Sequence, residues 1–376
     1  MQKYYENFKD KIYKHKFGEM KNLIIFIPSI EKAGVEKNLF IICNYLIKKI
    51  DNISIITANN NFNKKFHNKI NIICPKTKFW NNKSRLLKSI YCLFKIFCIF
   101  KKDDNILFSF QASLFATIIS KIFNYKLILR LNTSPNKYIN NNFKKFIFKI
   151  IYKSADEIIV NSKQFKNLLK KQLQINSKFI YNPAIFSFKI EKKINRLDKK
   201  LQILNIGRLT DQKDQITLLK ALNLAKKNNI PFSAKIIGSG YKYNELKNYI
   251  KQKDLKNEIH LLGYKDKAYK FMNKASVFIL SSKYEGLPNV LIEAQQFNLP
   301  IISTNCPSGP KEILMNGKLG ELFPVGNYRA LYQEIEKFYY SQRKLIKKSN
   351  MAKKYLKRFS LERNCKMYFK LINKYI

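Results

Sequence analysis

The chain has 376 residues, enough for two domains that each bury a hydrophobic core. Hydrophobic residues make up 46% of it and aromatic residues 14%, which excludes a disordered protein. The formal net charge of +47 predicts attraction to anionic partners, either a membrane that contains acidic lipids or nucleic acid.

The positive charge is concentrated in the first half of the chain. Between positions 52 and 155 there are 19 Lys and Arg residues, and the only acidic residues are Asp103 and Asp104. The six cysteines form no C-x-x-C pair and four lie in apolar segments, so we expect buried free thiols in a reducing compartment. Residues 1–20 lack the apolar core of a secretory signal, and no run reaches about 18 apolar residues, the length that a membrane span needs. We therefore expect a cytoplasmic protein.

The first predicted strand is the apolar run from Leu23 to Ile27. A loop with Ala33 and Gly34 follows, and then a helical pattern that extends to about Lys49. A strand, a glycine loop and a helix open a doubly wound α/β unit, and ligands bind at such loops. Further strands are predicted at 53–57, 70–73, 106–109, 127–130 and 158–160. This alternation predicts a mostly parallel sheet with helices on both faces.

Two stretches of the first half, 80–102 and 142–153, combine lysines with aromatic residues. In the first, apolar residues lie at helical spacing and lysines seven positions apart lie on another face: Leu86, Ile90, Leu93 and Phe97 against Lys88, Lys95 and Lys102. Such a helix either lies in a membrane interface or packs its apolar side on the core and exposes its lysines to water. The second stretch favours membrane contact, because two such surfaces on one domain are hard to explain otherwise.

The chain becomes polar at 188–200, where we place a linker, and a new strand runs from Leu201 to Ile206. It leads into Gly207, Arg208 and Lys213, which we expect at the carboxyl end of that strand, facing a cleft between domains. Two cations there can neutralise a diphosphate without a metal ion, although single Arg and Lys residues are usually only solvated. The next strand ends in a Gly-x-Gly turn that begins at Gly238.

A buried strand from Val277 to Leu280 leads into a loop with Glu285 and Gly286, and Pro288 is predicted to open a helix that contains Glu293. The free N–H groups and positive dipole end of that helix form a seat for a phosphate. The two carboxylates can accept hydrogen bonds from hydroxyls on either side of it, which suits a sugar nucleotide. The alternative is that Glu285 caps the helix and Glu293 is solvated.

The motif EGLPNVLIEA at 285–294 resembles the E-x7-E motif of the retaining glycosyltransferases of family 4, also called glycosyl transferases group 1. The segment GRLTDQKD at 207–214 resembles the phosphate loop of the same family. SGPKEIL at 308–314 resembles a variant from bacterial enzymes that build polysaccharides or glycan lipids, in which Glu312 is expected to be structural. The resemblance spans nearly the whole chain and is most specific from Leu201 to Pro324.

The resemblance implies the GT-B fold, in which two Rossmann-like doubly wound α/β domains face each other across a cleft. The acceptor-binding domain would comprise 1–187 and a closing helix at 359–376 with Ser360 as N-cap. The nucleotide-sugar-binding domain would comprise 201–358, after the linker at 188–200.

The resemblance also implies retaining transfer of a hexose or N-acetylhexosamine from a nucleotide sugar, with UDP as the expected nucleotide. The acceptor would be a glycan or a polyprenyl-linked glycan used in cell-surface polysaccharide, lipopolysaccharide or glycoconjugate synthesis. Glu285, Arg208 and Lys213 would be catalytic. The donor would be bound by Gly34, Gly207, Arg208, Lys213, Gly238, Glu285, Gly286, Leu287, Pro288, Asn289, Val290 and Glu293.

Arg130 and Asn132 occupy the region where many family members place a histidine, and they are the candidate acceptor residues. His15, His67 and His260 do not fit that place. With no evident protein base, the implied mechanism is a front-face reaction in which the leaving phosphate takes the proton of the acceptor.

No cofactor and no metal are expected, because the chain contains no D-x-D triplet. The basic first domain predicts a peripheral position at the inner face of the plasma membrane. Two other functions remain open. One is a basic nucleic-acid-binding protein, which lacks a reading motif here, and the other is a sugar-nucleotide epimerase on the same fold.

Overall fold

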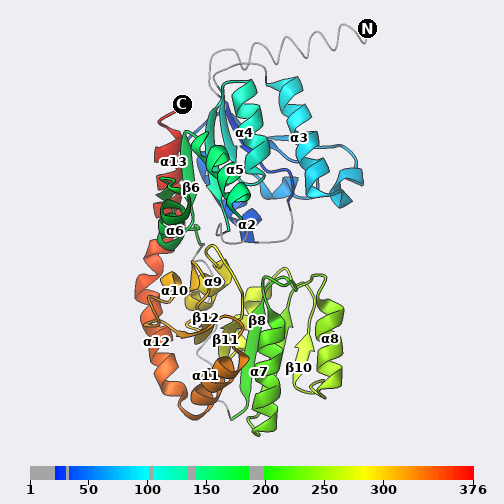
Figure 1. Cartoon of the computed structure of the whole chain (residues 1–376), viewed down its shortest axis with the longest axis vertical. Helices are drawn as coiled ribbons and strands as arrows, with labels where there is room; N and C mark the ends of the chain where they lie inside the picture. The colour runs from blue at the N-terminus through cyan, green and yellow to red at the C-terminus, as the bar shows by residue number, and fades with distance from the viewer. Residues whose placement is uncertain (1–21, 31–33, 101–104, 134–140, 186–198) are drawn as a thin grey trace.

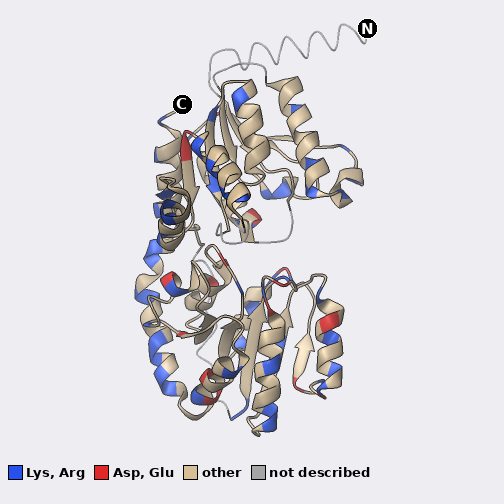
Figure 2. Ribbon diagram, in the orientation of Figure 1, with Lys and Arg blue, Asp and Glu red and all other residues tan. Residues whose placement is uncertain are grey.

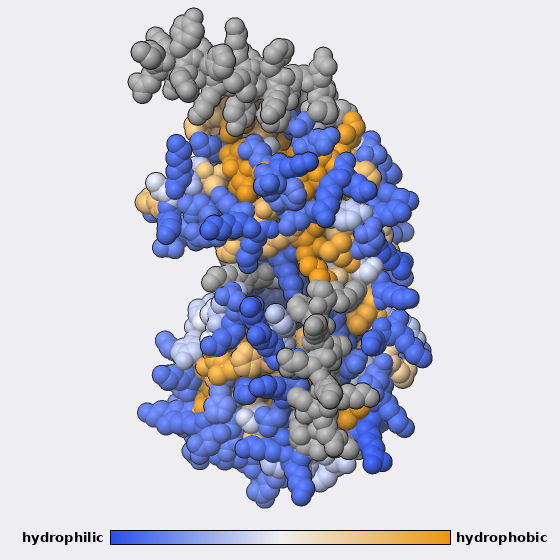
Figure 3. Space-filling view, turned by 180° about the vertical axis from the view of Figure 1, so that it is seen from behind, coloured by the Kyte–Doolittle hydropathy of each residue, from blue (hydrophilic) through white to orange (hydrophobic). Residues whose placement is uncertain are grey.

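The computed structural model describes residues 22–30, 34–100, 105–133, 141–185 and 199–376. The leader, Ala33, the acidic pair at 103–104 and all but the last two residues of the predicted linker lie outside the described residues. The chain forms two lobes, one above the other, and its last helix returns to the first lobe (Figure 1). Lys and Arg are spread over both lobes (Figure 2), and the surface is indented between them (Figure 3).

The first lobe is built on a seven-stranded parallel sheet in the order β3-β2-β1-β4-β5-β6-β7. Its strands are β1 (Leu23–Phe26), β2 (Ile53–Ile56), β3 (Asn71–Ile73), β4 (Ile106–Ser109), β5 (Lys126–Leu131), β6 (Glu157–Val160) and β7 (Lys178–Phe179). The six predicted strands are confirmed to within two residues at either end. Strand β7 was not predicted, because two residues are too short for a periodic signal.

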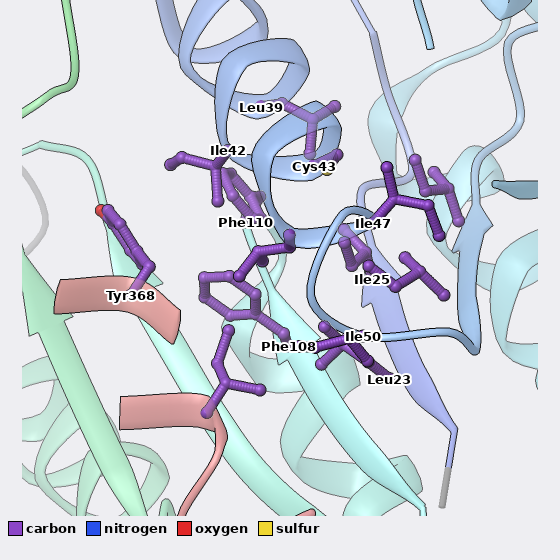
Figure 4. Packing of buried hydrophobic residues seen from close by; sticks show 14 of the residues in the cluster. Leu23, Ile25, Leu39, Ile42, Cys43, Ile47, Ile50, Phe108, Phe110 and Tyr368 are labelled. Carbon is purple, nitrogen blue, oxygen red and sulfur yellow. The ribbon is translucent and has the colours of Figure 1, made fainter. Parts of the chain in front are cut away.

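Helices cover both faces of this sheet. α2 (Gly34–Leu46) and α13 (Leu361–Ile372) pack on one face, and α3 (Arg85–Ile99), α4 (Ser113–Ile122), α5 (Asn142–Lys153) and α6 (Lys163–Leu173) pack on the other. Alternation along a strand sends Ile25 into the first layer and Ile24 into the second. Figure 4 shows the first layer, in which Tyr368 of α13 lies near Phe108 and Phe110.

The second lobe repeats the plan with a six-stranded parallel sheet, β10-β9-β8-β11-β12-β13. Its strands are β8 (Leu201–Ile206), β9 (Phe232–Ile237), β10 (Ile259–Leu261), β11 (Val277–Leu280), β12 (Ile301–Thr304) and β13 (Glu321–Phe323). Its helices are α7 (Gln215–Lys227), α8 (Tyr243–Gln252), α9 (Asn289–Gln296), α10 (Pro310–Ile313), α11 (Tyr328–Tyr340) and α12 (Gln342–Tyr355). Both sheets have the strand order of doubly wound nucleotide-binding folds.

The orientation of helix α3 differs from both interpretations of its sequence, the membrane-interface helix and the core-facing helix, because each of them leaves Lys88 at the surface. Lys88 is buried, and its Nζ donates to the carbonyl oxygen of Asn81 at 2.8 Å. Cys92 and Ile96 face the core, whereas Leu86, Ile90 and Phe97 are 49–59% exposed. Leu93, the fourth residue of the predicted apolar stripe, packs against the core. The core-facing interpretation is therefore wrong for the other three residues, and the prediction that Lys88 faces water is wrong as well. No helix in the described parts of the chain is long and apolar enough to cross a membrane.

Besides the chain segment that leads from the first lobe into the second, a contact near the end of the chain also connects the two lobes. Ala184 lies beside Ser360 in a parallel bridge, and its N–H donates to the carbonyl oxygen of Phe359 at 2.8 Å. Ser360 occupies the N-cap position of α13, but its hydroxyl makes no capping hydrogen bond. Its carbonyl oxygen instead accepts hydrogen bonds from the backbone and side-chain amides of Asn364.

Candidate active site

A cavity of about 320 Å³ lies between the lobes, and we call it the interlobe cavity. It is lined by the loops that follow β1 and β5 in the first lobe and β8, β9 and β11 in the second. In each sheet the strand order reverses beside the first strand of that sheet. Loops diverge at such a reversal and leave room for a ligand at the carboxyl ends of the strands. The topology therefore places a site here before any side chain is considered.

All of the predicted donor-binding residues line the interlobe cavity. They are Gly34, Gly207, Arg208, Lys213, Gly238, Glu285, Gly286, Leu287, Pro288, Asn289, Val290 and Glu293. Asn132, one of the two predicted acceptor residues, lines it as well. Segments as far apart along the chain as those of Gly34 and Glu293 are thus brought together around one space.

Lys213 and Glu285 form a buried ion pair, with 2.5 Å between Lys213 Nζ and Glu285 Oε1. Their side chains are 15% and 7% exposed. Ser282 Oγ also donates to Glu285 Oε1, at 2.7 Å. The aliphatic part of Lys213 passes over Gly207, where a Cβ atom would lie 3.4 Å from it. A lysine fixed in this way offers a positive charge to a phosphate, while Glu285 keeps a second oxygen for a hydroxyl.

Helix α9 begins one residue later than predicted. Pro288 has an extended conformation, with ψ of 105°, and occupies the N-cap, so it is not the first helical residue. The N–H of Leu291 donates back to the carbonyl oxygen of Pro288 at 3.1 Å. The N–H groups of Asn289 and Val290 stand in the first turn, at the positive end of the helix dipole and beside the cavity.

Glu293, one turn into α9, forms an ion pair across the cavity with Lys37 of α2. Asn289 makes a second connection, because its Nδ2 donates to the carbonyl oxygen of Gly34 at 3.1 Å. Sequence reasoning missed Lys37 and Asn38, which both line the cavity. Their place one turn after the glycine loop is a signal that could have revealed them, since residues there point back over the helix N-terminus.

Two glycines are required by close approaches around the cavity. A Cβ atom on Gly238, whose φ is 153°, would lie 1.8 Å from the carbonyl oxygen of Gly207. A Cβ atom on Gly286 would lie 2.1 Å from the carbonyl oxygen of Asn132 in the other lobe. The loops of the second lobe can therefore approach each other and the first lobe only because these positions lack a side chain.

Arg130 lies beneath the cavity and does not line it. The side chain is 2% exposed; its Nε donates to Tyr368 Oη and its Nη2 to Asn182 Oδ1, both at 2.8 Å. Asn182 in turn donates to Asn289 Oδ1 at 2.7 Å. Arg130 Nη1 also donates to Oδ1 of Asn132, which does line the cavity. The guanidinium thus holds Asn132, Asn182 and the C-terminal helix, and the predicted acceptor contact of Arg130 stays a prediction.

Glu312 has a structural position, as expected. Its carboxylate accepts hydrogen bonds from the backbone N–H groups of Lys163 and Gln164 at 3.0 and 2.9 Å, at the N-terminus of α6 in the other lobe. Tyr181 Oη donates to the same carboxylate at 2.6 Å. Burial and this carboxylate raise the pKa of Tyr181, which keeps the phenol protonated as a donor. Glu312 therefore caps a helix across the lobe boundary.

Among the described residues, no group of three or more His, Cys, Asp or Glu side chains is placed to hold a metal ion. Within the same residues all six cysteines are free. Of the four in apolar segments, Cys43 and Cys92 are buried as predicted, but Cys74 is partly exposed and Cys98 is exposed, so for those two the prediction is wrong. Cys306 and Cys365 are buried as well. The described lining of the interlobe cavity contains no histidine. The charged groups of the lining are lysines, Arg208 and the two glutamates.

Comparison with known proteins agrees with this geometry. Residues 187–359 match the family model described as glycosyl transferases group 1. An uncharacterized glycosyltransferase of Methanocaldococcus jannaschii is 33% identical over 252 residues, covering 61% of this chain and 62% of that protein. N-acetylgalactosamine-N,N'-diacetylbacillosaminyl-diphospho-undecaprenol 4-alpha-N-acetylgalactosaminyltransferase of Campylobacter jejuni is 29% identical over 233 residues, covering 59% and 63%.

The aligned region thus spans somewhat less than two thirds of each of these two relatives. In overall structure the chain is similar to Anabaena HepE, solved in complex with UDP and glucose, with a TM-score of 0.76 at 16% identity. That match covers 94% of this chain and all of the other. The predicted GT-B fold is confirmed.

Proposed function

We propose, from the match of residues 187–359 to the glycosyl transferases group 1 model, that this protein transfers a hexose or N-acetylhexosamine from a nucleotide sugar to a glycan acceptor. The observation that carries the proposal is the convergence of Arg208, the Lys213–Glu285 ion pair and the N-terminus of α9 on one cavity. The cations and the helix dipole suit a diphosphate, and the carboxylates suit the hydroxyls that flank it.

In this proposal the diphosphate of the donor lies against Arg208, Lys213 and the first N–H groups of α9. Glu285 accepts hydrogen bonds from hydroxyls of the transferred sugar, and Glu293 accepts those of the ribose. Glu293 lies one helical turn beyond the anion seat and on the same side of the helix, so a ligand that meets the dipole end can also reach it. We propose UDP as the nucleotide, since HepE was crystallised with it.

We further propose that the reaction proceeds with retention and without a metal ion. The bond between the anomeric carbon and the donor phosphate oxygen breaks, and the acceptor oxygen bonds to that carbon from the same face. The acceptor's proton passes to the departing phosphate oxygen. Arg208 and Lys213 would stabilise the negative charge that develops on the leaving diphosphate, the role that a divalent cation has in other enzymes.

The acceptor proposed here is a polyprenyl-linked glycan at the inner face of the plasma membrane, with Asn132 as a contact. The Campylobacter jejuni relative supports this class, because its name describes a diphospho-undecaprenol acceptor. The basic first lobe supports a peripheral membrane position, since lysines near a bilayer are attracted to acidic lipids.

The first test is thermal unfolding of the purified protein with UDP, GDP and ADP, each with and without EDTA. A nucleotide at a hundredfold excess over its dissociation constant adds about 2.7 kcal/mol of stability, which corresponds to several degrees. We expect a shift with UDP that EDTA leaves unchanged. Glu293→Ala should weaken the shift, while Glu334→Ala, which alters a surface pair on α11, should keep it.

A shift that requires a divalent cation would contradict metal independence but leave the donor site intact. Absence of any nucleotide shift in the wild-type protein would contradict the donor site itself. Conversion of the donor without an acceptor would instead indicate an epimerase.

A further inference from the structure

Helices α3, α4 and α5 cover the same face of the first sheet and lie side by side (Figure 1). Each turns apolar side chains away from the core into solvent. Two from each helix define what we call the apolar face: Ile90 and Phe94 (49% and 62% exposed), Ile118 and Ile122 (43% and 62%), and Phe143 and Phe146 (70% and 61%). Figure 3, from behind, also shows hydrophobic side chains at the surface of the first lobe.

The apolar face is not needed to hold the lobe together. The inward sides of the three helices have their own buried residues, such as Cys92, Ala116 and Ile151. A helix that is apolar on its inner side normally has polar residues on its outer side. Six large apolar side chains on three adjacent helices therefore indicate a surface that is covered in the working protein.

The charges around the apolar face identify what covers it. The sequences of α3, α4 and α5 contain no Asp or Glu, and α5 has four lysines within its 12 residues (Figure 2). Lysines beside exposed Phe and Ile residues match acidic headgroups above an acyl region. A second copy of the chain would bring two basic surfaces together, which is unfavourable. Stacking on nucleic acid requires a groove of aromatic residues, whereas this surface is formed by helices and mixes Ile with Phe.

We propose that the apolar face docks on an anionic bilayer, with its phenylalanines at the level of the headgroups and its lysines on the lipid phosphates. In a doubly wound lobe each helix begins near the carboxyl end of the preceding strand, which is where the interlobe cavity lies. Docking would thus hold the mouth of the cavity near lipid-linked molecules. The inference names the surface behind the proposed membrane position, but the docking itself does not require that the protein transfer a sugar.

The test is co-sedimentation of the full chain with vesicles of phosphatidylcholine alone and of phosphatidylcholine with phosphatidylglycerol. We expect binding to the second kind, weakened by salt. The triple variant Phe94→Gln, Ile122→Gln, Phe143→Gln should lower the partition coefficient at least tenfold. Lys144→Gln with Lys145→Gln should lower it as well, by about fivefold for each charge. A matched control, Tyr241→Gln with Tyr340→Gln, changes side chains of the second lobe that are 70% and 75% exposed, and should bind like the wild type.

Trp80 provides a second readout, because it is the only tryptophan of the chain and its ring lies 4.7 Å from that of Tyr91 on α3. Its emission should shift to shorter wavelength on anionic vesicles. Equal binding by the triple variant and the wild type overturns the proposal, and so does absence of vesicle binding. If the wild type is a dimer and the triple variant is a monomer, the apolar face serves self-association. If the protein binds an oligonucleotide but no vesicles, the face serves nucleic acid. Either result also overturns the proposal. The thermal shift that UDP causes should be the same in the triple variant as in the wild type. That result would show that the triple variant is folded, and that its loss of vesicle binding does not come from damage to the donor site.

Discussion

At the scale of single residues, the contact that matters most is the one between Lys213 and Glu285. Both groups are largely withdrawn from water and each is the counter-ion of the other. Charges in such a place are stable only while they are paired, because the protein interior solvates them poorly. The pair therefore holds a cation and a carboxylate side by side at the wall of the cavity, and the proposed roles toward a phosphate and a hydroxyl rest on this arrangement.

Replacement of Lys213 should make this dependence visible. Lys213→Ala leaves the carboxylate of Glu285 buried without its cation, and we expect a loss of about 3 kcal/mol in the free energy of unfolding. In the double variant Lys213→Ala, Glu285→Gln no buried charge remains, so part of the loss should be recovered. Urea unfolding of the wild type, both single variants and the double variant measures the coupling. Strictly additive losses would show that the two residues are independent.

The cysteines should differ sharply in reactivity. Burial raises the pKa of Cys306 and Cys365 to about 12 and also raises the pKa of Cys43 and Cys92, so these thiols stay protonated at mildly alkaline pH. Cys98 is exposed. Titration with a thiol reagent should therefore give one fast phase, absent in Cys98→Ser, and release of the buried thiols only in denaturant. Fast reaction of more than two thiols in the native protein would contradict the buried positions.

At the scale of elements, the decisive contacts are those in which a helix of one lobe is bonded by residues of the other lobe. Helix α6 belongs to the first sheet, yet its first N–H groups bind Glu312 of the second lobe. Helix α9 belongs to the second sheet, yet its Glu293 and Asn289 bind α2 of the first. Unpaired groups at helix ends are ready partners for such contacts, so the relative position of the lobes depends on helix termini.

Glu312→Ala should loosen the N-terminus of α6. The loss of two charge-assisted hydrogen bonds at a helix N-terminus should cost about 1 kcal/mol. Hydrogen exchange of the peptide that contains Lys163 and Gln164 should become faster, with little change in the sheet of the second lobe. Glu245→Ala, which removes a surface carboxylate of α8, is the control and should leave that peptide unchanged. Unchanged exchange in Glu312→Ala would mean that Ser162, the N-cap of α6, holds the helix by itself.

At the scale of the whole molecule, β1 and α13, the first strand and the last helix among the described residues, belong to the same lobe. Helix α13 buries Cys365, Tyr368, Leu371 and Ile372 in the core of the first lobe. Tyr368 also accepts the hydrogen bond of the buried Arg130, which supports Asn182 under the cavity. The last helix thus contributes to both the core and the floor of the site.

Deletion of 361–376 should therefore damage the first lobe although it removes only the end of the chain. We expect the unfolding transition of the first lobe to be lost or strongly lowered and that of the second lobe to be retained, as measured by limited proteolysis and calorimetry. Tyr368→Phe removes only the hydroxyl and should cost about 1–3 kcal/mol, because a buried charged group loses its partner. Deletion of Ile376 alone, a residue that is 45% exposed, is the control. A truncated protein with both transitions intact would show that α13 is dispensable.

Much of the fold could be predicted because it depends on neighbours in the chain. Strands such as Val277–Leu280 are short apolar runs bounded by turn residues, and the loops that carry Gly207 and Glu285 follow directly from such strands. In a parallel doubly wound sheet, loops after adjacent strands meet at one edge. The predicted donor residues consequently line one cavity, although their roles in binding remain proposals.

What the sequence alone determined is thus the two-lobed α/β plan and the set of loops that surround the cavity, since periodicity and loop chemistry are local properties. Only the tertiary structure decided which groups face each other across the lobes. The contact of Lys37 with Glu293, the burial of Arg130 under Tyr368 and the outward direction of Ile90 all depend on partners or cores formed by distant segments. Helical spacing shows that residues share a face, but whether that face meets core or solvent depends on how the whole helix is placed against the sheet.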